Sequence, residues 1–247
     1  MESIHNLVQM AATGPDYSYH FGERNTTGWI KRLFESYCRM FLFRIYCPVI
    51  STGKQHLPDS SFLLCSNHSS HMDSVALMVA SGKPFGRFGM MAAMDYFFEN
   101  KTRKVFLNEF MNLIPIKRQP SIHEVVDAII ACRQFIQDSH RAIIIFPEGT
   151  RSLSGQLLPF KKGAAMIAIE LGIPIIPAYI RGTRDAMPKG RGFIRPGKII
   201  VSIGRALDPA NYIDHSCNGR FNKSYRYLTR ELESKIHRLK EVSGLEN

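Results

Sequence analysis

The fold is decided by one stretch of sequence, Ala142-Ile143-Ile144-Ile145-Phe146-Pro147-Glu148-Gly149-Thr150-Arg151-Ser152. Its first five residues are apolar and rich in β-branched side chains, which predicts a strand buried on both faces of a sheet. Pro147 ends this strand because proline has no N–H to donate to a neighbouring strand. Gly149 permits a tight turn, so a polar loop follows directly from the carboxyl end of the strand.

Strands and helices alternate outward from this stretch in both directions. Short apolar runs predict further strands at residues 61–65, 88–93, 113–116, 173–180 and 198–203. Periodic segments predict helices at residues 28–47, 71–80, 95–110, 121–138, 161–171 and 221–242. Ser121 stands three residues before Glu124, a capping-box pattern at a helix start. We expect the strand at 173–180 to be irregular or near an edge, because it contains two prolines.

This alternation predicts an α/β fold, a three-layer sandwich with a central, mostly parallel or mixed sheet. In such folds, the loops that leave the carboxyl ends of the strands carry the functional site. The loops that follow strands 61–65 and 142–146 are therefore the first candidates, and both contain the residues discussed below.

Composition and charge limit the possible functions without choosing one. The 247 residues are 45% hydrophobic and 21% charged, which is ordinary for one compact domain and too apolar for a disordered chain. The net charge of +11 suits nucleic acid, an anionic membrane surface or an acidic partner. The five cysteines are odd in number, widely spaced and without a C-x-x-C pair, so we expect neither a disulfide framework nor a structural zinc site, and a reducing compartment fits best.

The N-terminal part contains no signal-peptide pattern and no run of about 18 uncharged apolar residues, so we expect no spanning helix. Residues 1–27 are polar and expected to be loose. The segment from Trp29 to Ile50 is rich in aromatic and aliphatic residues but is interrupted by arginines. It suits either a helix lying in a membrane interface or a helix packed on the protein's own core, and the sequence leaves both open.

The first candidate loop has the sequence Asn67-His68-Ser69-Ser70-His71-Met72-Asp73. Attack by a hydroxyl group needs a base to take its proton, and a neutral imidazole such as that of His68 serves near pH 7. A carboxylate at Asp73 would fix the tautomer of this imidazole. A hydrogen-bonded loop histidine is the ordinary alternative, and a metal site with His71 is a weaker one. No G-x-S-x-G sequence is present, so we do not expect a serine nucleophile.

The second candidate loop is the turn after residue 146. Thr150, Ser152 and the amides of the turn offer hydrogen bonds, and Arg151 offers a planar fork that suits a phosphate group. A phosphorylated acceptor fits this set of donors, although an ordinary surface turn with a solvated arginine fits it as well.

Four blocks in order, covering about residues 60–180, resemble the glycerolipid acyltransferase family that includes bacterial 1-acyl-glycerol-3-phosphate acyltransferases. That family carries N-H-x-S-x-x-D and, about eighty residues later, F-P-E-G-T-R-S, both matched by the two loops. The other two blocks are a short apolar stretch that ends in arginine, and F-K-x-G before a proline-bearing strand. In this chain the apolar stretch is Ile114-Pro115-Ile116-Lys117-Arg118. The F-K-x-G block is Phe160-Lys161-Lys162-Gly163, and the strand after it contains Ile173-Pro174-Ile175-Ile176-Pro177.

The resemblance implies an enzyme that moves a fatty acyl group from acyl-coenzyme A or acyl carrier protein to the hydroxyl of 1-acyl-glycerol-3-phosphate. It implies that His68 is the general base and Asp73 its orienting partner, with no metal and no cofactor besides the acyl thioester. The residues implied to bind or shape the acceptor site are Arg118, Glu148, Gly149, Thr150 and Arg151.

The resemblance also implies an organisation in two parts. Residues 1–55 would be a flexible segment followed by an amphipathic helical element that associates with a membrane. Residues 56–247 would be the acyltransferase catalytic domain. We accordingly expect a peripheral or monotopic protein on the cytoplasmic face of a membrane, with membrane lipids and the acyl donor as partners and no nucleic acid.

One departure from the family pattern concerns the acceptor. Family members that use lysophosphatidic acid often carry lysine in an A-K-x-E-L block, whose counterpart here is Ala92-Ala93-Met94-Asp95-Tyr96-Phe97. Lys101, Arg103 or Lys104 would have to replace that lysine, or the acceptor is another lysophospholipid or lipid. A non-catalytic basic module that binds membrane or nucleic acid is a third alternative, but it leaves both loops unexplained.

Overall fold

The computed structural model describes residues 3–12, 28–93, 112–117, 119–137, 140–188, 190, 192–214 and 221–245. Its strands are β1 (Val49–Thr52), β2 (Phe62–Ser66), β3 (Phe88–Ala93), β4 (Leu113–Ile116), β5 (Ala142–Ile145), β6 (Ile175–Arg181) and β7 (Ile199–Ile203). Its α-helices are α1 (Ile4–Ala12), α2 (Gly28–Ser36), α3 (Asp73–Ser81), α6 (Ile122–Ile136), α7 (Gly163–Leu171), α8 (Thr183–Ala186) and α9 (Asn222–Leu245). The π-helix η1 (Tyr37–Tyr46) continues α2, and short 3₁₀ turns are η2 (Lys54–His56), η3 (Phe85–Arg87) and η4 (Pro209–Tyr212).

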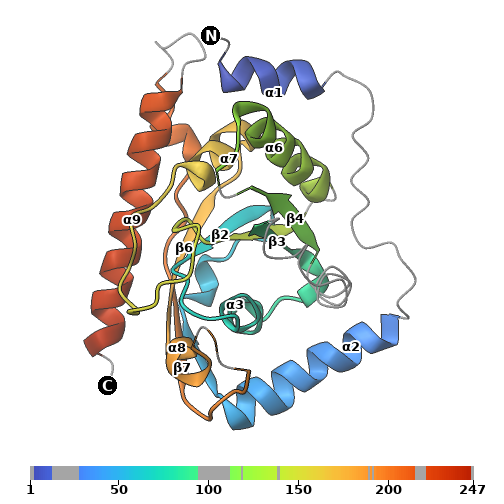
Figure 1. Ribbon diagram of the computed structural model, residues 1–247, viewed down its shortest axis with the longest axis vertical. Coiled ribbons are helices and arrows are strands. Elements are labelled where there is room, and N and C mark those ends of the chain that lie inside the picture. The colour runs from blue at the N-terminus through green and yellow to red at the C-terminus, as the bar shows by residue number, and fades with distance from the viewer. Residues whose placement is uncertain are drawn as a thin grey trace.

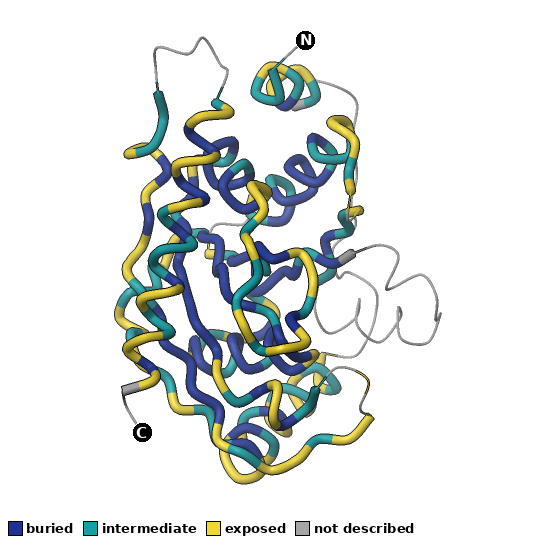
Figure 2. The backbone as a smooth tube through the Cα atoms, turned by 60° about the vertical axis from the view of Figure 1, so that its left-hand side comes forward, coloured by how far each residue is buried: buried dark blue, intermediate teal, exposed yellow. Residues whose placement is uncertain are grey.

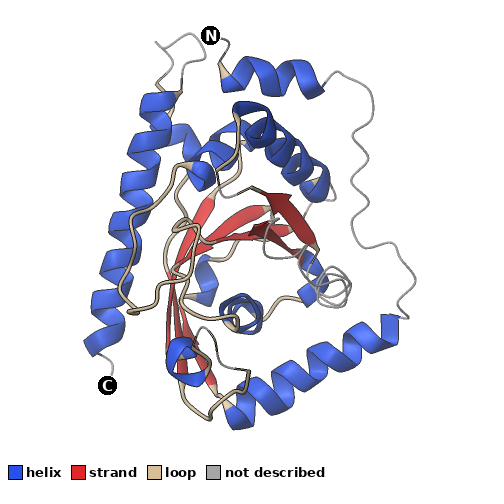
Figure 3. Ribbon diagram, viewed as in Figure 1, coloured by secondary structure: helices blue, strands red, loops and turns tan. Residues whose placement is uncertain are grey.

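The strands form a seven-stranded sheet in the order β1-β7-β6-β2-β5-β3-β4. All neighbouring pairs are parallel except β6 and β7, which are antiparallel. Helices lie on both sides of the sheet, with α1, α6, α7 and α9 around one face and α2 and α3 on the other (Figures 1 and 3). The predicted three-layer α/β fold with a mostly parallel, mixed sheet is confirmed.

The two layers of core follow from the alternation of side chains along the central strands. Leu63 and Ile143 point into the core that contains α6, α7 and α9, whereas Leu64 and Ile144 point into the core that contains α3. All four are completely buried, and Figure 2 shows the strands as the buried centre of the molecule. Each such side chain contributes about 1.5–3 kcal/mol through the removal of apolar surface from water.

The prediction that residues 173–180 form an irregular or edge strand is wrong. β6 lies inside the sheet between β2 and β7, and residues 175–180 are buried. Pro177 is tolerated because antiparallel pairing with β7 begins only at Ala178, so its missing N–H removes no bond from that ladder. The carbonyl of Pro177 still accepts a hydrogen bond, from the N–H of Gly204 at 2.8 Å.

The expectation that residues 1–27 are loose is wrong for the part that the structure describes. α1 packs against α6, with Val8 completely buried and Ile4, Leu7 and Ala11 packed on the same core. This i, i+3, i+4, i+7 spacing is an amphipathic stripe on a short helix. His5 holds α1 in place through a 2.9 Å contact from its Nδ1 to the buried carboxylate of Glu170 in α7.

The helix expected at residues 28–47 is confirmed as α2 followed by η1. Its inner face packs on α3, with Cys38 and Phe43 buried. Its outer face exposes seven large apolar side chains: Trp29, Leu33, Tyr37, Met40, Phe41, Ile45 and Tyr46. Pro48 follows the helix, and the chain then enters β1, an edge strand that the sequence did not predict.

The remaining predicted elements are confirmed where the structure describes them. The capping box at Ser121 and Glu124 opens α6, and Gly172 ends α7 in a left-handed conformation. The helix expected at 95–110 lies outside the described residues. No helix within the described ranges is both long enough and apolar enough to cross a membrane.

Candidate active site

The two candidate loops meet at the carboxyl edge of the sheet. β2 and β5 are parallel neighbours, so the chain leaves both strands at the same edge. His68 follows the end of β2 by two residues, and Glu148 follows the end of β5 by three. The two loops are joined directly, because Ser152 N–H donates to the carbonyl of His68 at 2.8 Å.

Asn67 fixes the start of the first loop. Its side-chain Oδ1 accepts from the N–H of Ile180 at 2.8 Å, and its Nδ2 donates to the carbonyl of Ile180 at 3.0 Å. The asparagine side chain therefore continues the β2–β6 ladder by one step after the backbone of β2 has turned away. This pair of bonds sets the direction in which the chain leaves the sheet toward His68.

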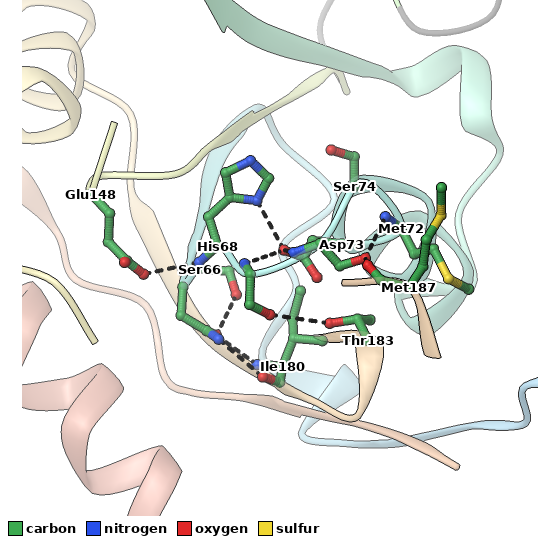
Figure 4. A network of polar contacts seen from close by, with 12 residues as sticks. Ser66, His68, Met72, Asp73, Ser74, Glu148, Ile180, Thr183 and Met187 are labelled. Atoms are coloured by element: carbon green, nitrogen blue, oxygen red, sulfur yellow. Dashed lines mark hydrogen bonds and ion pairs between the residues drawn. The ribbon is translucent and has the colours of Figure 1, made fainter. Parts of the chain in front are cut away.

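His68 and Asp73 form the pair that the sequence predicted. The Nδ1 atom of His68 lies 2.9 Å from Oδ2 of Asp73 (Figure 4). Because a carboxylate only accepts hydrogen bonds, this contact places the proton on Nδ1 and leaves the lone pair on Nε2 available. The His68 side chain is 20% exposed, whereas the Asp73 side chain is completely buried.

The carboxylate of Asp73 is held by the loop that it orients. Its Oδ2 accepts from the N–H groups of Ser69 at 2.7 Å and Ser70 at 2.8 Å, in addition to the histidine. Charge-assisted bonds of this kind are stronger than neutral ones. Its Oδ1 is buried without a hydrogen-bond partner among the described residues, which is a costly arrangement that proteins keep at functional positions.

The plane of the imidazole is fixed from its other side by Phe146. The two rings stack with centroids 3.9 Å apart and an interplanar angle of 11°. From the sequence, Phe146 is expected only as the last residue of a strand. The motif alone carries no signal for this contact, because it depends on the register of β2 against β5.

Glu148 links the backbone of the first loop to the backbone at Leu158 through hydrogen bonds. Its Oε1 accepts from the N–H of His68 at 2.9 Å and its Oε2 from the N–H of Leu158 at 3.2 Å. In Figure 4 it approaches His68 from the side opposite Asp73. Burial raises the pKa of this carboxyl to about 7, an effect that the two N–H donors oppose. A direct contact between Glu148 and an acceptor stays a prediction, because both oxygens already bind backbone donors.

The rest of the turn is exposed at its tip and becomes more buried after it. Gly149 adopts φ +68°, the left-handed region that glycine favours. Gly149 and Thr150 are exposed, and Arg151 is half-buried. These three belong to the turn whose Ser152 N–H binds the carbonyl of His68, and their contact with an acceptor stays a prediction. Arg118, the other predicted phosphate ligand, lies outside the described residues.

Lys161 is a residue of the site that sequence reasoning left without a role. Its N–H donates to the carbonyl of Pro147 at 2.8 Å. Its side chain crosses the turn so closely that a Cβ at Gly149 would lie 2.9 Å from Nζ. The signal was present in the F-K-x-G block, but only the fold shows that this lysine brings a positive charge to Gly149.

Ser70 and Thr183 tie the loop to the segment that follows β6. Ser70 Oγ donates to the carbonyl of Met187 at 2.7 Å, and Ser69 Oγ lies 3.4 Å from Thr183 Oγ1. Both loop serines are buried, so their hydroxyls hold the loop in shape. Within the described part of the chain, no three His, Cys, Asp or Glu side chains gather as they would around a metal ion.

Comparison with known proteins gives a consistent result. A family model described as Acyltransferase matches residues 48–181, more than half of the chain. A chloroplast 1-acyl-sn-glycerol-3-phosphate acyltransferase of Brassica napus is 30% identical over 164 residues, which is 63% of this chain and 44% of that protein. A probable 1-acyl-sn-glycerol-3-phosphate acyltransferase of Mycoplasma pneumoniae is 26% identical over 204 residues, 77% of this chain and 73% of that protein.

A solved structure shows the same fold. The crystal structure of the 1-acyl-sn-glycerophosphate (LPA) acyltransferase PlsC from Thermotoga maritima matches with a TM-score of 0.61 at 23% identity, covering 95% of this chain and 88% of that one. The chain spans about half the length of the plant and algal relatives that it matches. The matched range of the family model contains both loops of the site, His68 with Asp73 and the turn after β5, and the chain belongs to the acyltransferase family.

Proposed function

We propose that this chain transfers a fatty acyl group from a thioester, acyl-coenzyme A or acyl carrier protein, to the hydroxyl of 1-acyl-glycerol-3-phosphate in phospholipid biosynthesis. The observation that carries the proposal is the 2.9 Å bond from His68 Nδ1 to the buried carboxylate of Asp73, at the mouth of a site shared with an acyltransferase family. The named relatives act on this acceptor, which supports the choice of substrate.

The reaction follows from the state of the imidazole. Nε2 of His68 takes the proton of the acceptor hydroxyl as its oxygen attacks the thioester carbonyl. The new C–O bond forms, the C–S bond breaks, and the departing thiolate receives the proton from the imidazolium. Asp73 stabilises the imidazolium through Nδ1. The acceptor supplies the nucleophile, so neither an enzyme serine nor a metal or further cofactor enters the scheme.

The acceptor phosphate fits the outward face of the turn. Arg151 follows the exposed Thr150 in the turn and is itself half-buried, and the Lys161 side chain crosses the same turn at Gly149. Arginine and lysine bind phosphate through charge-assisted hydrogen bonds. We assign Arg118 to the same phosphate on the strength of the family resemblance. The carbonyl oxygen of the thioester needs donors as well, and the N–H groups at this mouth are candidates.

We also propose that the outer face of α2 and η1 lies in the interface of the cytoplasmic face of a membrane. Its exposed side chains include Trp29, Leu33 and Ile45, at 56%, 58% and 70% exposure. The exposed Arg32 and Arg44 flank them and suit anionic headgroups. An acceptor and product with acyl chains are lipids themselves, so a peripheral position brings the site to its substrate.

The decisive experiment is thiol release from a long-chain acyl thioester, with and without 1-acyl-glycerol-3-phosphate, in wild type and His68→Ala. Loss of a general base lowers turnover by about 10²- to 10⁴-fold. His71→Ala is the matched control, since His71 is exposed in the same loop and has no role in the scheme. Turnover by His68→Ala close to that of wild type would refute the mechanism. A clear preference for another lysophospholipid in an acceptor panel would refute the substrate.

The membrane proposal is tested by sedimentation with phospholipid vesicles. Leu33→Glu combined with Ile45→Glu places two charges on the exposed apolar face and should abolish vesicle binding. Ile122→Glu makes the same change at the start of α6, where Ile122 is 42% exposed, and should leave binding intact. Undiminished binding by the double variant would remove this face from the proposal.

A further inference from the structure

The outer face of α9 is a row of basic side chains. Ser224, Tyr225, Leu228, Leu232 and Ile236 face the core, which turns the opposite side of the helix to solvent. That side exposes Lys223, Arg226, Arg230 and Arg238. At 100° per residue these four positions share one face of the helix. We call these four side chains the α9 basic row.

The α9 basic row is not neutralised within the part of the chain that the structure describes. None of its four members forms an ion pair with another described residue, and Glu231 is engaged by Lys235 at 3.2 Å. Glu241 is the exposed acid on the same face, with Glu233 half-buried at its border. The row therefore keeps an excess of positive charge, which is available to an acidic partner.

The dimensions of the row favour a protein partner over a nucleotide. Lys223 and Arg238 are fifteen positions apart (238 − 223), and at a rise of 1.5 Å per residue the row is about 22 Å long. A nucleotide needs a compact set of converging donors. A straight, exposed and uniformly charged row suits an acidic surface of similar length on another folded protein.

The C-terminal end of α9, just beyond the α9 basic row, is connected to the candidate site through the loop between β5 and α7. Lys240 Nζ, at the end of α9, donates to Gln156 Oε1 at 2.9 Å. Ser152 Oγ donates to the carbonyl of Gln156 at 2.6 Å, and Ser152 N–H donates to the carbonyl of His68. Figure 1 shows this loop running beside α9. A protein bound on α9 would therefore lie next to the loop that shapes the site.

The row lies on a different side of the molecule from the apolar face of α2 and η1. Figure 1 shows α9 along one side of the sheet and α2 along another. A protein held at a membrane by α2 and η1 would keep α9 open to a soluble partner. Fewer large apolar side chains are exposed on α9 than on α2 and η1. On α9 these are Tyr227 and Val242.

We propose that the α9 basic row docks an acidic acyl carrier protein, which delivers its thioester to His68. This inference rests on the acyl-transfer function proposed above and names the donor for it. Opposite charges steer such a partner to the surface and raise its association rate, in a way that salt suppresses. The covalently attached acyl arm then reaches the site past the loop that Lys240 holds.

The test compares two donors with the same acyl chain, acyl carrier protein thioester and acyl-coenzyme A, each with 1-acyl-glycerol-3-phosphate. Arg226→Glu combined with Arg230→Glu should lower kcat/KM for the carrier-protein thioester by about tenfold or more, through KM, and leave the coenzyme A value unchanged. Lys54→Glu is the control for charge: Lys54 is exposed after β1, which runs antiparallel to β6 and so ends at the opposite edge of the sheet. Circular dichroism and the unfolding midpoint check that each variant is folded.

The outcomes separate this inference from the proposed function. Turnover of acyl-coenzyme A without turnover of the carrier-protein thioester overturns the docking surface and leaves acyl transfer in place. If the double variant keeps the wild-type kcat/KM for both donors, the docking surface is overturned as well. If the double variant instead loses binding to anionic vesicles and keeps its carrier-protein turnover, the row serves the membrane. No turnover of either donor by the wild type overturns the proposed function and the docking surface together.

Discussion

Replacing Glu148 by glutamine tests how the catalytic loop is held. The two carboxylate oxygens accept from the N–H groups of His68 and Leu158, at 2.9 and 3.2 Å. Glutamine has one oxygen to accept, and its amide N–H₂ faces the second N–H as another donor. One part-buried backbone N–H then loses its partner, which costs up to about 1–3 kcal/mol of unfolding free energy. His68 should also be positioned less well, and kcat should fall.

The pH dependence of this cost has a definite sign. Burial raises the pKa of Glu148 from 4.5 to about 7, so between these values the folded state binds more protons than the unfolded state. The stability that this proton contributes is fully present below pH 4.5 and is lost as the pH rises through 7. At about 1.4 kcal/mol per pH unit, the 2.5 units between 4.5 and 7 correspond to about 3–4 kcal/mol. Glutamine does not titrate and lacks this slope.

Urea unfolding of the wild type and Glu148→Gln at several values between pH 5 and pH 8 measures the difference. The wild type should lose unfolding free energy relative to the variant as the pH rises toward 7, and the difference should be constant above it. Groups other than Glu148 titrate in both proteins and cancel in the comparison. A difference that is independent of pH over this range would refute the argument that burial sets the ionisation of Glu148.

Three further changes test other parts of the structure. Asp73→Asn should lower kcat by about 10²- to 10⁴-fold in steady-state turnover, because the amide no longer fixes the imidazole tautomer; an unchanged kcat would contradict the pair. Gly149→Ala should cost about 1–2 kcal/mol in urea unfolding from its φ of +68°. The flexible end of Lys161 can move, so a cost far above that of Gly82→Ala, which has φ +74° and open space around it, would contradict this account. Ser121→Ala should lower the unfolding free energy by about 1 kcal/mol by removing the cap of α6, and unaltered stability would show that the cap contributes nothing.

Much of the fold could be predicted because short stretches of neighbouring residues determine its elements. The apolar run at 142–145 is buried on both faces, and the Ser121 cap is made by residues three apart. The position of β6 could not be predicted, since it depends on where β7 begins to pair along it. β1 could not be predicted because it is a four-residue edge strand with every second residue exposed.

The contacts of the candidate site also divide into local ones, which the sequence indicates, and ones between distant residues, which it does not. His68 and Asp73 are five residues apart on one loop, so their spacing alone indicated the pair. The bond from Glu148 to the N–H of His68 joins residues eighty positions apart, and the stacking of Phe146 depends on the same pairing of strands. No local pattern encodes such contacts. The role of Lys161 likewise appears only when the chain returns across Gly149.

The pairing of β1 with β7 has a consequence for the order of events during synthesis. Val49 pairs with Ile199, 150 positions later in the chain (199 − 49). At about 5–20 residues per second, a ribosome needs roughly 8 to 30 s to make that interval. Throughout this time β1 has no β7 to pair with, while the apolar segment α2–η1 just before it has already emerged. The nascent chain can thus meet a lipid surface through that segment before its sheet is complete.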